Sequence, residues 1–172
     1  MTFEQRLAEG ERYEAKVAQR LATDLGTYGG FLVQTTVKPE KPCTDWYTQN
    51  QTDIWVFYPA TGRFVGVEVK SRSIVFSAKP ESFPYPTIFV DRASTYDAKT
   101  VKPYATLHIS TETKDVLALP GASKPTWSLV SKWDHKQSRQ MPEAYEAPKE
   151  ALITYRAFTR ELRDWLEYGD ED

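Results

Sequence analysis

The sequence predicts a single α/β domain, because helical patterns lie near both ends of the chain and a series of strands lies between them. Near the N-terminus, apolar residues recur with the spacing of one helix face at Leu7, Val17, Leu21 and Leu25. Near the C-terminus, a closing helix is marked by Phe158, Leu162, Trp165 and Leu166. At 172 residues the chain has the length of one domain, which we expect to span 1–172.

The first helix is expected to end at Gly26 and to be followed by a strand over 31–38 and a polar loop over 39–51. Glu14 lies on the apolar face of this helix, seven residues from both Leu7 and Leu21. Two interpretations are open for it. The glutamate either reaches water at the edge of the apolar stripe or serves a functional site.

Two further strands, 52–58 and 63–70, are joined by a four-residue turn that begins with Pro59 and ends with Gly62. If Tyr58 pairs with Arg63, the numbers of opposed residues sum to 121 along the ladder. Asp53 then lies opposite Glu68, and Lys70 lies on the same face of the sheet. The hairpin therefore predicts that these three charged groups converge.

The second half of the chain has a less regular pattern. We expect a strand over 87–91, a short helix over 93–100 and a hairpin over 104–119 with its turn at 111–114. A loop-rich excursion is expected over about 120–148, and 149–156 fits either strand or helix. Within the excursion, a cluster of cations around Trp133 comprises Lys132, Lys136 and Arg139.

Composition excludes several classes of protein. The net charge is −2, which argues against a broadly basic nucleic-acid coat, and no run of about 18 apolar residues is present to span a membrane. The charged N-terminus does not resemble a signal peptide, so we expect a cytoplasmic protein without a membrane partner. One cysteine and two separated histidines have no zinc-site spacing, and His108 is interpreted as a hydrogen-bonded structural residue.

The pair of opposed acids predicts a cation site. Two facing carboxylates repel each other unless a proton or a cation intervenes. Carboxylate oxygens, completed by waters and substrate phosphates, are the ligands that Mg²⁺ prefers. An isolated E-x-K, however, is more often a surface ion pair between its own two residues, here Glu68 and Lys70.

The chain resembles the signature of the PD-(D/E)XK nuclease superfamily in two short segments. These are Asp53-Ile54 before the turn and Val67-Glu68-Val69-Lys70 after it. The first helix is similar to that of its Holliday-junction-resolvase-like members at Gly10, Glu14, Ala18, Leu21 and Gly26. The resemblance spans residues 10–72, and Thr52 stands where the named pattern has proline. It implies a restriction-endonuclease-like core, in which a central mixed β-sheet is flanked by helices.

The resemblance also implies roles for five residues. Asp53 and Glu68 would bind Mg²⁺, with Mn²⁺ as a substitute, and the backbone carbonyl of Val69 would add a ligand. Lys70 would assist the attacking water, and Glu14 would support the metal or the water.

We therefore expect a Mg²⁺-dependent nuclease that hydrolyses phosphodiester bonds of DNA with a metal-activated water, as an endonuclease. Arg72 projects from the same strand face as Lys70 and is a candidate phosphate contact. The cluster of Lys132, Lys136 and Arg139 is either a nucleic-acid contact or an ordinary solvated loop. The alternative function is a non-catalytic nucleic-acid-binding or assembly module. No separate recognition domain is visible in the sequence, so a homodimer or a delivery partner is considered.

Overall fold

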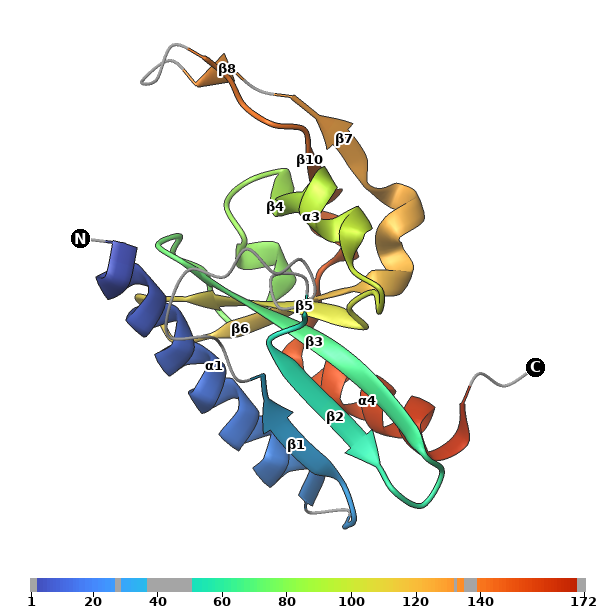
Figure 1. Cartoon of the computed structure of the whole chain (residues 1–172). Coiled ribbons are helices and arrows are strands. Elements are labelled where there is room, and N and C mark those ends of the chain that lie inside the picture. Colours follow the sequence, from blue (N-terminus) through green and yellow to red (C-terminus); the bar gives the residue numbers. More distant parts are fainter. Residues whose placement is uncertain (1–2, 27–28, 37–50, 132, 135–138, 170–172) are drawn as a thin grey trace.

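A six-stranded mixed sheet forms the centre of the computed structural model, which describes residues 3–26, 29–36, 51–131, 133–134 and 139–169 (Figure 1). Its strands are β1 (Leu32–Thr35), β2 (Ile54–Tyr58), β3 (Arg63–Arg72), β5 (Ala105–Ser110), β6 (Val116–Pro120) and β11 (Ile153–Thr154), in that spatial order. Strands β3 and β5 are parallel, and all other neighbours are antiparallel. With helices packed on this sheet, the predicted α/β class with a central mixed sheet is confirmed.

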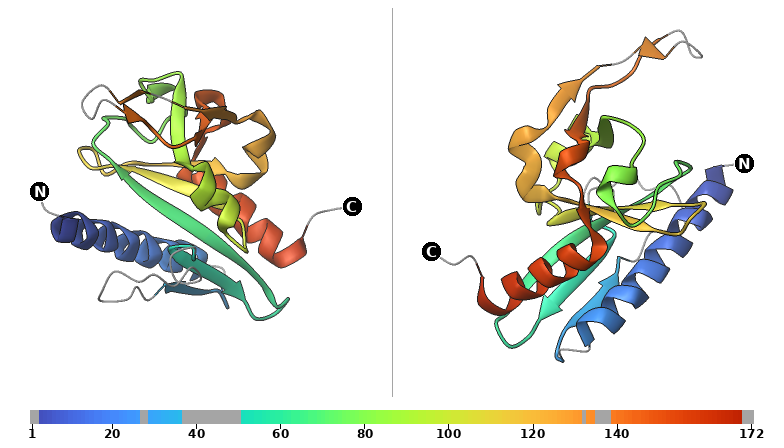
Figure 2. Two further views of the ribbon diagram at one scale, coloured as in Figure 1. Left: turned by 45° about the horizontal axis from the view of Figure 1, so that its top comes forward. Right: turned by 180° about the vertical axis from the view of Figure 1, so that it is seen from behind.

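Helices α1 (Phe3–Gly26) and α4 (Tyr155–Tyr168) cover the same face of the sheet, as the view from behind shows (Figure 2). Helix α4 begins where the Thr154 hydroxyl accepts a hydrogen bond from the Ala157 amide at 3.1 Å. The two helices and the sheet enclose one apolar core, to which α1 contributes Tyr13, Val17, Ala18, Leu21 and Leu25. The helical periodicity of the sequence therefore identified the buried face of α1 correctly.

The β2–β3 hairpin has the predicted register, with Tyr58 opposite Arg63 and Ile54 opposite Val67. Its turn closes through a hydrogen bond from the Gly62 amide to the Tyr58 carbonyl at 2.9 Å. Gly62 has φ of 72°, a left-handed conformation that glycine adopts without steric cost. The four-residue turn thus fixes which residues of the two strands share a face.

A second, three-stranded sheet packs with the short helix α3 (Ala93–Ala98) beyond the other face of the central sheet (Figure 1). It consists of β4 (Thr87–Arg92), β10 (Ala144–Pro148) and β7 (Ser128–Val130). The remaining elements are η1 (Pro80–Ser82), η2 (Gly121–Thr126), η3 (Lys149–Ala151) and the short pair β8 (Trp133–Asp134) and β9 (Arg139–Gln140). The expected loop over 120–148 is therefore only partly a loop, because β10 pairs with the distant β4 and β7 pairs with β10.

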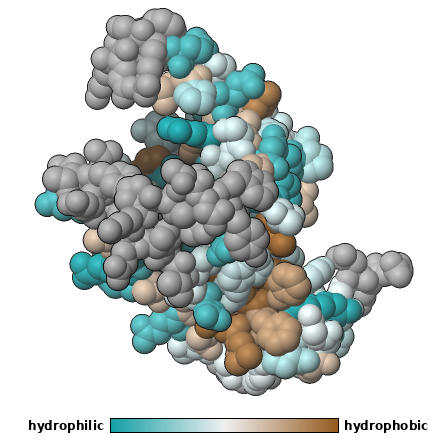
Figure 3. Space-filling view, viewed as in Figure 1, coloured by the Kyte–Doolittle hydropathy of each residue, from teal (hydrophilic) through white to brown (hydrophobic). Residues whose placement is uncertain are grey.

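An apolar strip is exposed on the face of β1–β3 that points away from the helices. Leu32, Phe57 and Phe64 lie beside one another in the ladder and are 58%, 37% and 53% exposed. The rings of Trp55 and Phe64 lie 5.8 Å apart. Brown side chains gather in the lower part of the space-filling view (Figure 3). This strip shares its face of β3 with the charged residues described next.

Candidate functional site

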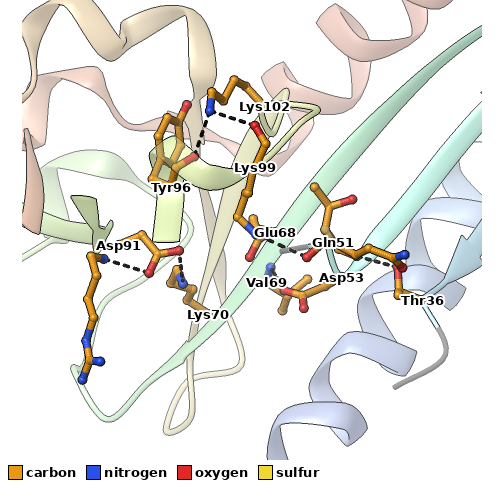
Figure 4. A network of polar contacts seen from close by, with 12 residues as sticks. Thr36, Gln51, Asp53, Glu68, Val69, Lys70, Asp91, Tyr96, Lys99 and Lys102 are labelled. Atoms are coloured by element: carbon orange, nitrogen blue, oxygen red, sulfur yellow. Dashed lines mark hydrogen bonds and ion pairs between the residues drawn. The ribbon is translucent and has the colours of Figure 1, made fainter. Parts of the chain in front are cut away.

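Successive side chains of β3 point alternately into the core and toward the opposite side, where the charged residues lie. Val65, Val67 and Val69 point into the core beneath α1 and α4. Glu68 and Lys70 point to the opposite side, where their partners lie on or just after α3 and on β4 (Figure 4). The predicted sharing of one face by Glu68 and Lys70 is thus confirmed.

Asp53 is held at the beginning of β2 by contacts on both sides. Its carbonyl accepts a hydrogen bond from the Thr36 amide at 2.8 Å, and its Oδ2 accepts one from the Val69 amide at 2.8 Å. The second bond draws the Asp53 carboxylate against the strand that carries Glu68. Asp53 therefore lies beside Glu68, as the register predicts, although the β2–β3 ladder itself begins one residue later at Ile54.

Gly66 makes room for the residue that precedes Asp53. A Cβ at this position would lie 2.5 Å from Thr52 Oγ1 and 2.6 Å from Thr52 Cγ2. Thr52 is only 1% exposed. The absence of a side chain at Gly66 is thus what allows Thr52 to pack on β3.

Glu68 pairs with a lysine that the sequence analysis did not identify. Lys99 follows α3, is buried, and its Nζ donates to Glu68 Oε1 at 2.7 Å. The same Nζ donates to the Gln51 carbonyl at 3.2 Å. The Glu68 carboxylate is therefore held from one side by a buried ammonium.

The pKa of Glu68 is raised to about 7 by burial and by the negative charge of Asp53. Lys99 and Lys70 act in the opposite direction, but the raising effects are larger. Glu68 is 6% exposed, so solvent screens its charge poorly. A further cation or a proton would consequently stabilise the two neighbouring carboxylates, Asp53 and Glu68.

Lys70 does not pair with Glu68, and the interpretation of E-x-K as an internal ion pair is wrong. Lys70 Nζ lies 3.3 Å from Oδ2 of Asp91 on β4. The side chains of Lys70 and Asp91 are 22% and 14% exposed, so the pair stands at the rim of the site. Asp91 also accepts a hydrogen bond from the Arg92 amide at 2.8 Å, which fixes its carboxylate. The second sheet thus supplies the partner of Lys70.

Arg72 lies further along the same face, against His108 and Phe89. Its Nε donates to His108 Nδ1 at 3.3 Å, its Nη2 donates to the Phe89 carbonyl at 2.5 Å, and its guanidinium lies 5.5 Å from the Phe89 ring centre. His108 is fully buried, and burial together with Arg72 and Lys70 lowers its pKa well below the usual value. The prediction of a hydrogen-bonded structural histidine is consistent with this neutral, accepting imidazole.

Glu14 is 7% exposed, so the interpretation of this residue as a glutamate reaching water is wrong. Its Oε1 lies 4.0 Å from where a Cβ of Gly10 would be, so the side chain extends toward the N-terminus of α1. Within the described residues, no three acidic, histidine or cysteine side chains are grouped to hold a metal ion. Glu14 therefore does not form a three-carboxylate cluster with Asp53 and Glu68, and its functional role stays a prediction.

The structure does not place the side chains of the other predicted nucleic-acid contacts. Lys132 and Lys136 lie outside the described residues, and Arg139 is placed only as part of the backbone of β9. The backbone of Val69 is beside the acid pair through its bond to Asp53, whereas the ligand role of its carbonyl stays a prediction.

The residues that are brought together fit a magnesium site in their chemistry. Two carboxylates supply hard oxygen ligands, and Mg²⁺ commonly uses only one or two of these while waters and phosphate oxygens complete its shell. Burial and the negative charge of Asp53 raise the pKa of Glu68, and a divalent cation would relieve the repulsion between the two carboxylates. Asp53 and Glu68 would hold the ion.

Comparison with solved structures shows a likeness to a viral nuclease. No protein-family model matches the sequence, and no curated protein matches it. The chain is similar to the solved structure of D212, a nuclease from a fusselovirus, with 11% sequence identity and a TM-score of 0.48 over 95% of this chain and 96% of that chain. At this level the likeness decides neither fold family nor function. In the described part of the chain, no helix is both long and apolar enough to span a membrane.

Proposed function

We propose that this chain is a Mg²⁺-dependent nuclease with a restriction-endonuclease-like core, acting on the phosphodiester bonds of DNA as an endonuclease. The observation that carries the proposal is the juxtaposition of Asp53 and Glu68 at one end of the β2–β3 hairpin, with Lys70 on the same face. The PD-(D/E)XK-like order of these residues in the sequence supports the same activity.

Each residue of the site would have a separate role in the reaction, according to its position. Asp53 and Glu68 would hold Mg²⁺, which when bound would supply Lewis-acid chemistry to the phosphodiester and to water. Lys70, held at the rim by Asp91, would orient the water and offset the charge that develops on the phosphate. Arg72 would contact a neighbouring phosphate, since its guanidinium lies along the same face, partly exposed beside Phe89.

The test is cleavage of labelled DNA by the purified protein. Linear, circular and branched duplexes, single strands and RNA are incubated with Mg²⁺, with Mn²⁺ and with EDTA. We expect DNA to be cut with either metal and left intact in EDTA, and cutting of the circle shows endonucleolytic attack. Full activity in excess EDTA, or no cleavage of any substrate, contradicts the proposal.

A non-catalytic nucleic-acid-binding or assembly module is the second candidate, and the Lys99–Glu68 ion pair favours it. A buried ammonium at 2.7 Å already gives Glu68 a positive partner without any metal. Such a module would bind DNA equally well in EDTA and would not be stabilised by Mg²⁺. Thermal melting with and without Mg²⁺ therefore distinguishes the two functions before any cleavage assay.

A further inference from the structure

The lysine in contact with the key glutamate comes from a part of the chain remote from the E-x-K pattern. Lys99 lies 31 residues after Glu68, is 4% exposed, and bonds both to Glu68 and to the Gln51 carbonyl. Gln51 stands two residues before Asp53 in the chain. One ammonium thus ties the segment that leads into Asp53 to the side chain of Glu68.

The position of Lys99 is itself fixed by the turn that follows α3. Its carbonyl accepts a hydrogen bond from Lys102 Nζ at 2.8 Å, and the same Nζ donates to the carbonyls of Tyr96 and Asp97. Tyr96 is buried and anchors α3 against the rings of Trp127 and Tyr145, with centroids at 5.3 and 5.7 Å. Lys99 is therefore presented to the acids from a firmly packed element.

A role in stability alone accounts poorly for this lysine. Burying an ion pair costs nearly as much in lost hydration as its attraction returns, so a buried pair is weak support for stability. Lys70, which lies on the same face of β3 as Glu68, is engaged with Asp91. Lys99 is consequently the cation that determines how the Glu68 carboxylate is oriented.

We propose that Lys99 is a positioning residue of the metal site, which fixes Glu68 Oε1 and thereby presents the second oxygen, Oε2, to the divalent cation. The proposal rests on the proposed nuclease function. Hydrogen-bond partners that orient metal ligands commonly change metal affinity or activity by about 10–100-fold when they are removed. Loss of Lys99 is therefore expected to weaken metal binding without direct contact between Lys99 and the substrate.

The experiment compares Lys99→Met with Lys79→Met, which removes the same charge from an exposed side chain ahead of η1 and leaves the contacts of Lys99 to Glu68 and Gln51 in place. Cleavage rates are measured against Mg²⁺ concentration, at a temperature where circular dichroism shows each variant to be folded. For Lys99→Met we expect the half-saturating Mg²⁺ concentration to rise about tenfold or more. Lys79→Met is expected to keep the wild-type metal dependence.

A second readout does not depend on turnover. Mg²⁺ should raise the melting temperature of wild type and of Lys79→Met, and should raise that of Lys99→Met much less at the same concentration. If Lys99→Met does not fold, Lys99→Gln replaces it, because the amide still donates a hydrogen bond but carries no charge. Lys99→Arg, which keeps the charge, should recover part of the metal affinity.

The outcomes separate the inference from the function on which it rests. Unchanged or tighter Mg²⁺ binding in folded Lys99→Met or Lys99→Gln overturns the positioning role, and tighter binding would identify Lys99 as a competitor of the metal. If wild type itself neither binds Mg²⁺ nor cleaves DNA, the proposed nuclease function fails and this inference fails with it.

Discussion

The raised pKa of Glu68 predicts an unusual dependence of stability on pH in the absence of metal. A carboxyl whose pKa is higher in the folded state than in the unfolded state holds its proton more tightly when folded. Its contribution to stability is therefore fully present below about pH 4.5 and is lost as the pH rises to about 7. For a shift from 4.5 to about 7, the loss amounts to about 3 kcal/mol at about 1.4 kcal/mol per pH unit.

The measurement is urea denaturation in EDTA from pH 4.5 to 8, for wild type and for Glu68→Gln. Other titrating groups are common to both proteins, so the difference between their free energies of unfolding isolates Glu68. At pH 4.5 the protonated carboxyl and the amide resemble each other, and the difference should be small. By pH 8, Glu68→Gln should be the more stable by about 3 kcal/mol. Asp53→Asn should reduce this pH dependence, because Asp53 is one cause of the raised pKa.

The opposite outcome has a clear physical meaning. It is a gain in the stability of wild type relative to Glu68→Gln between pH 4.5 and 7. That result would mean that the ion pair with Lys99 stabilises the Glu68 carboxylate by more than burial and the charge of Asp53 destabilise it. The two carboxylates would then need no further cation. Millimolar Mg²⁺ provides the complementary measurement. It should remove the loss of stability at pH 8 in wild type and have little effect on Glu68→Gln.

Four further predictions follow from individual contacts. Lys70→Ala should suppress cleavage while metal-induced stabilisation is retained, as measured by single-turnover kinetics and melting; wild-type rates would remove Lys70 from the mechanism. Asp91→Asn should lower the cleavage rate less than Lys70→Ala does, because it releases Lys70 without deleting it. Glu14→Gln should reduce activity in a folded protein, and unchanged kinetics at all Mg²⁺ concentrations would refute a functional role. Gly66→Ala should cost about 1–3 kcal/mol in urea denaturation, because its methyl would overlap the side chain of Thr52.

The sequence predicted the β2–β3 hairpin and its register because local rules determine both. A four-residue turn ending in glycine sets which residues oppose one another, and alternation then places Glu68 and Lys70 on one face. The helix face of α1 followed in the same way from periodicity. These features depend on residues close together in the chain.

The partners of the two charged residues were missed because they depend on contacts between distant segments. Lys99 and Asp91 carry no distinguishing pattern, and a lysine following a short amphipathic helix is ordinarily expected in water. The only available signal was the charge balance, since two acids and one lysine on a buried face leave an uncompensated negative charge. The second sheet was missed for a related reason, as β7 and β10 are short and β10 pairs with β4, which is distant in sequence.

Side chains of β3 alternate between its two faces, so the residues that pack in the core differ from those that face the candidate site. Val65, Val67 and Val69 join the strand to the helices, while Lys70 forms its ion pair with Asp91 of the outer layer. Exchange of the rim lysine therefore leaves the interior contacts of the same strand untouched. An inactive Lys70 variant should consequently retain the shape of the surface around the acid pair, and under the proposed function it is the form in which an uncut substrate can be captured for crystallography.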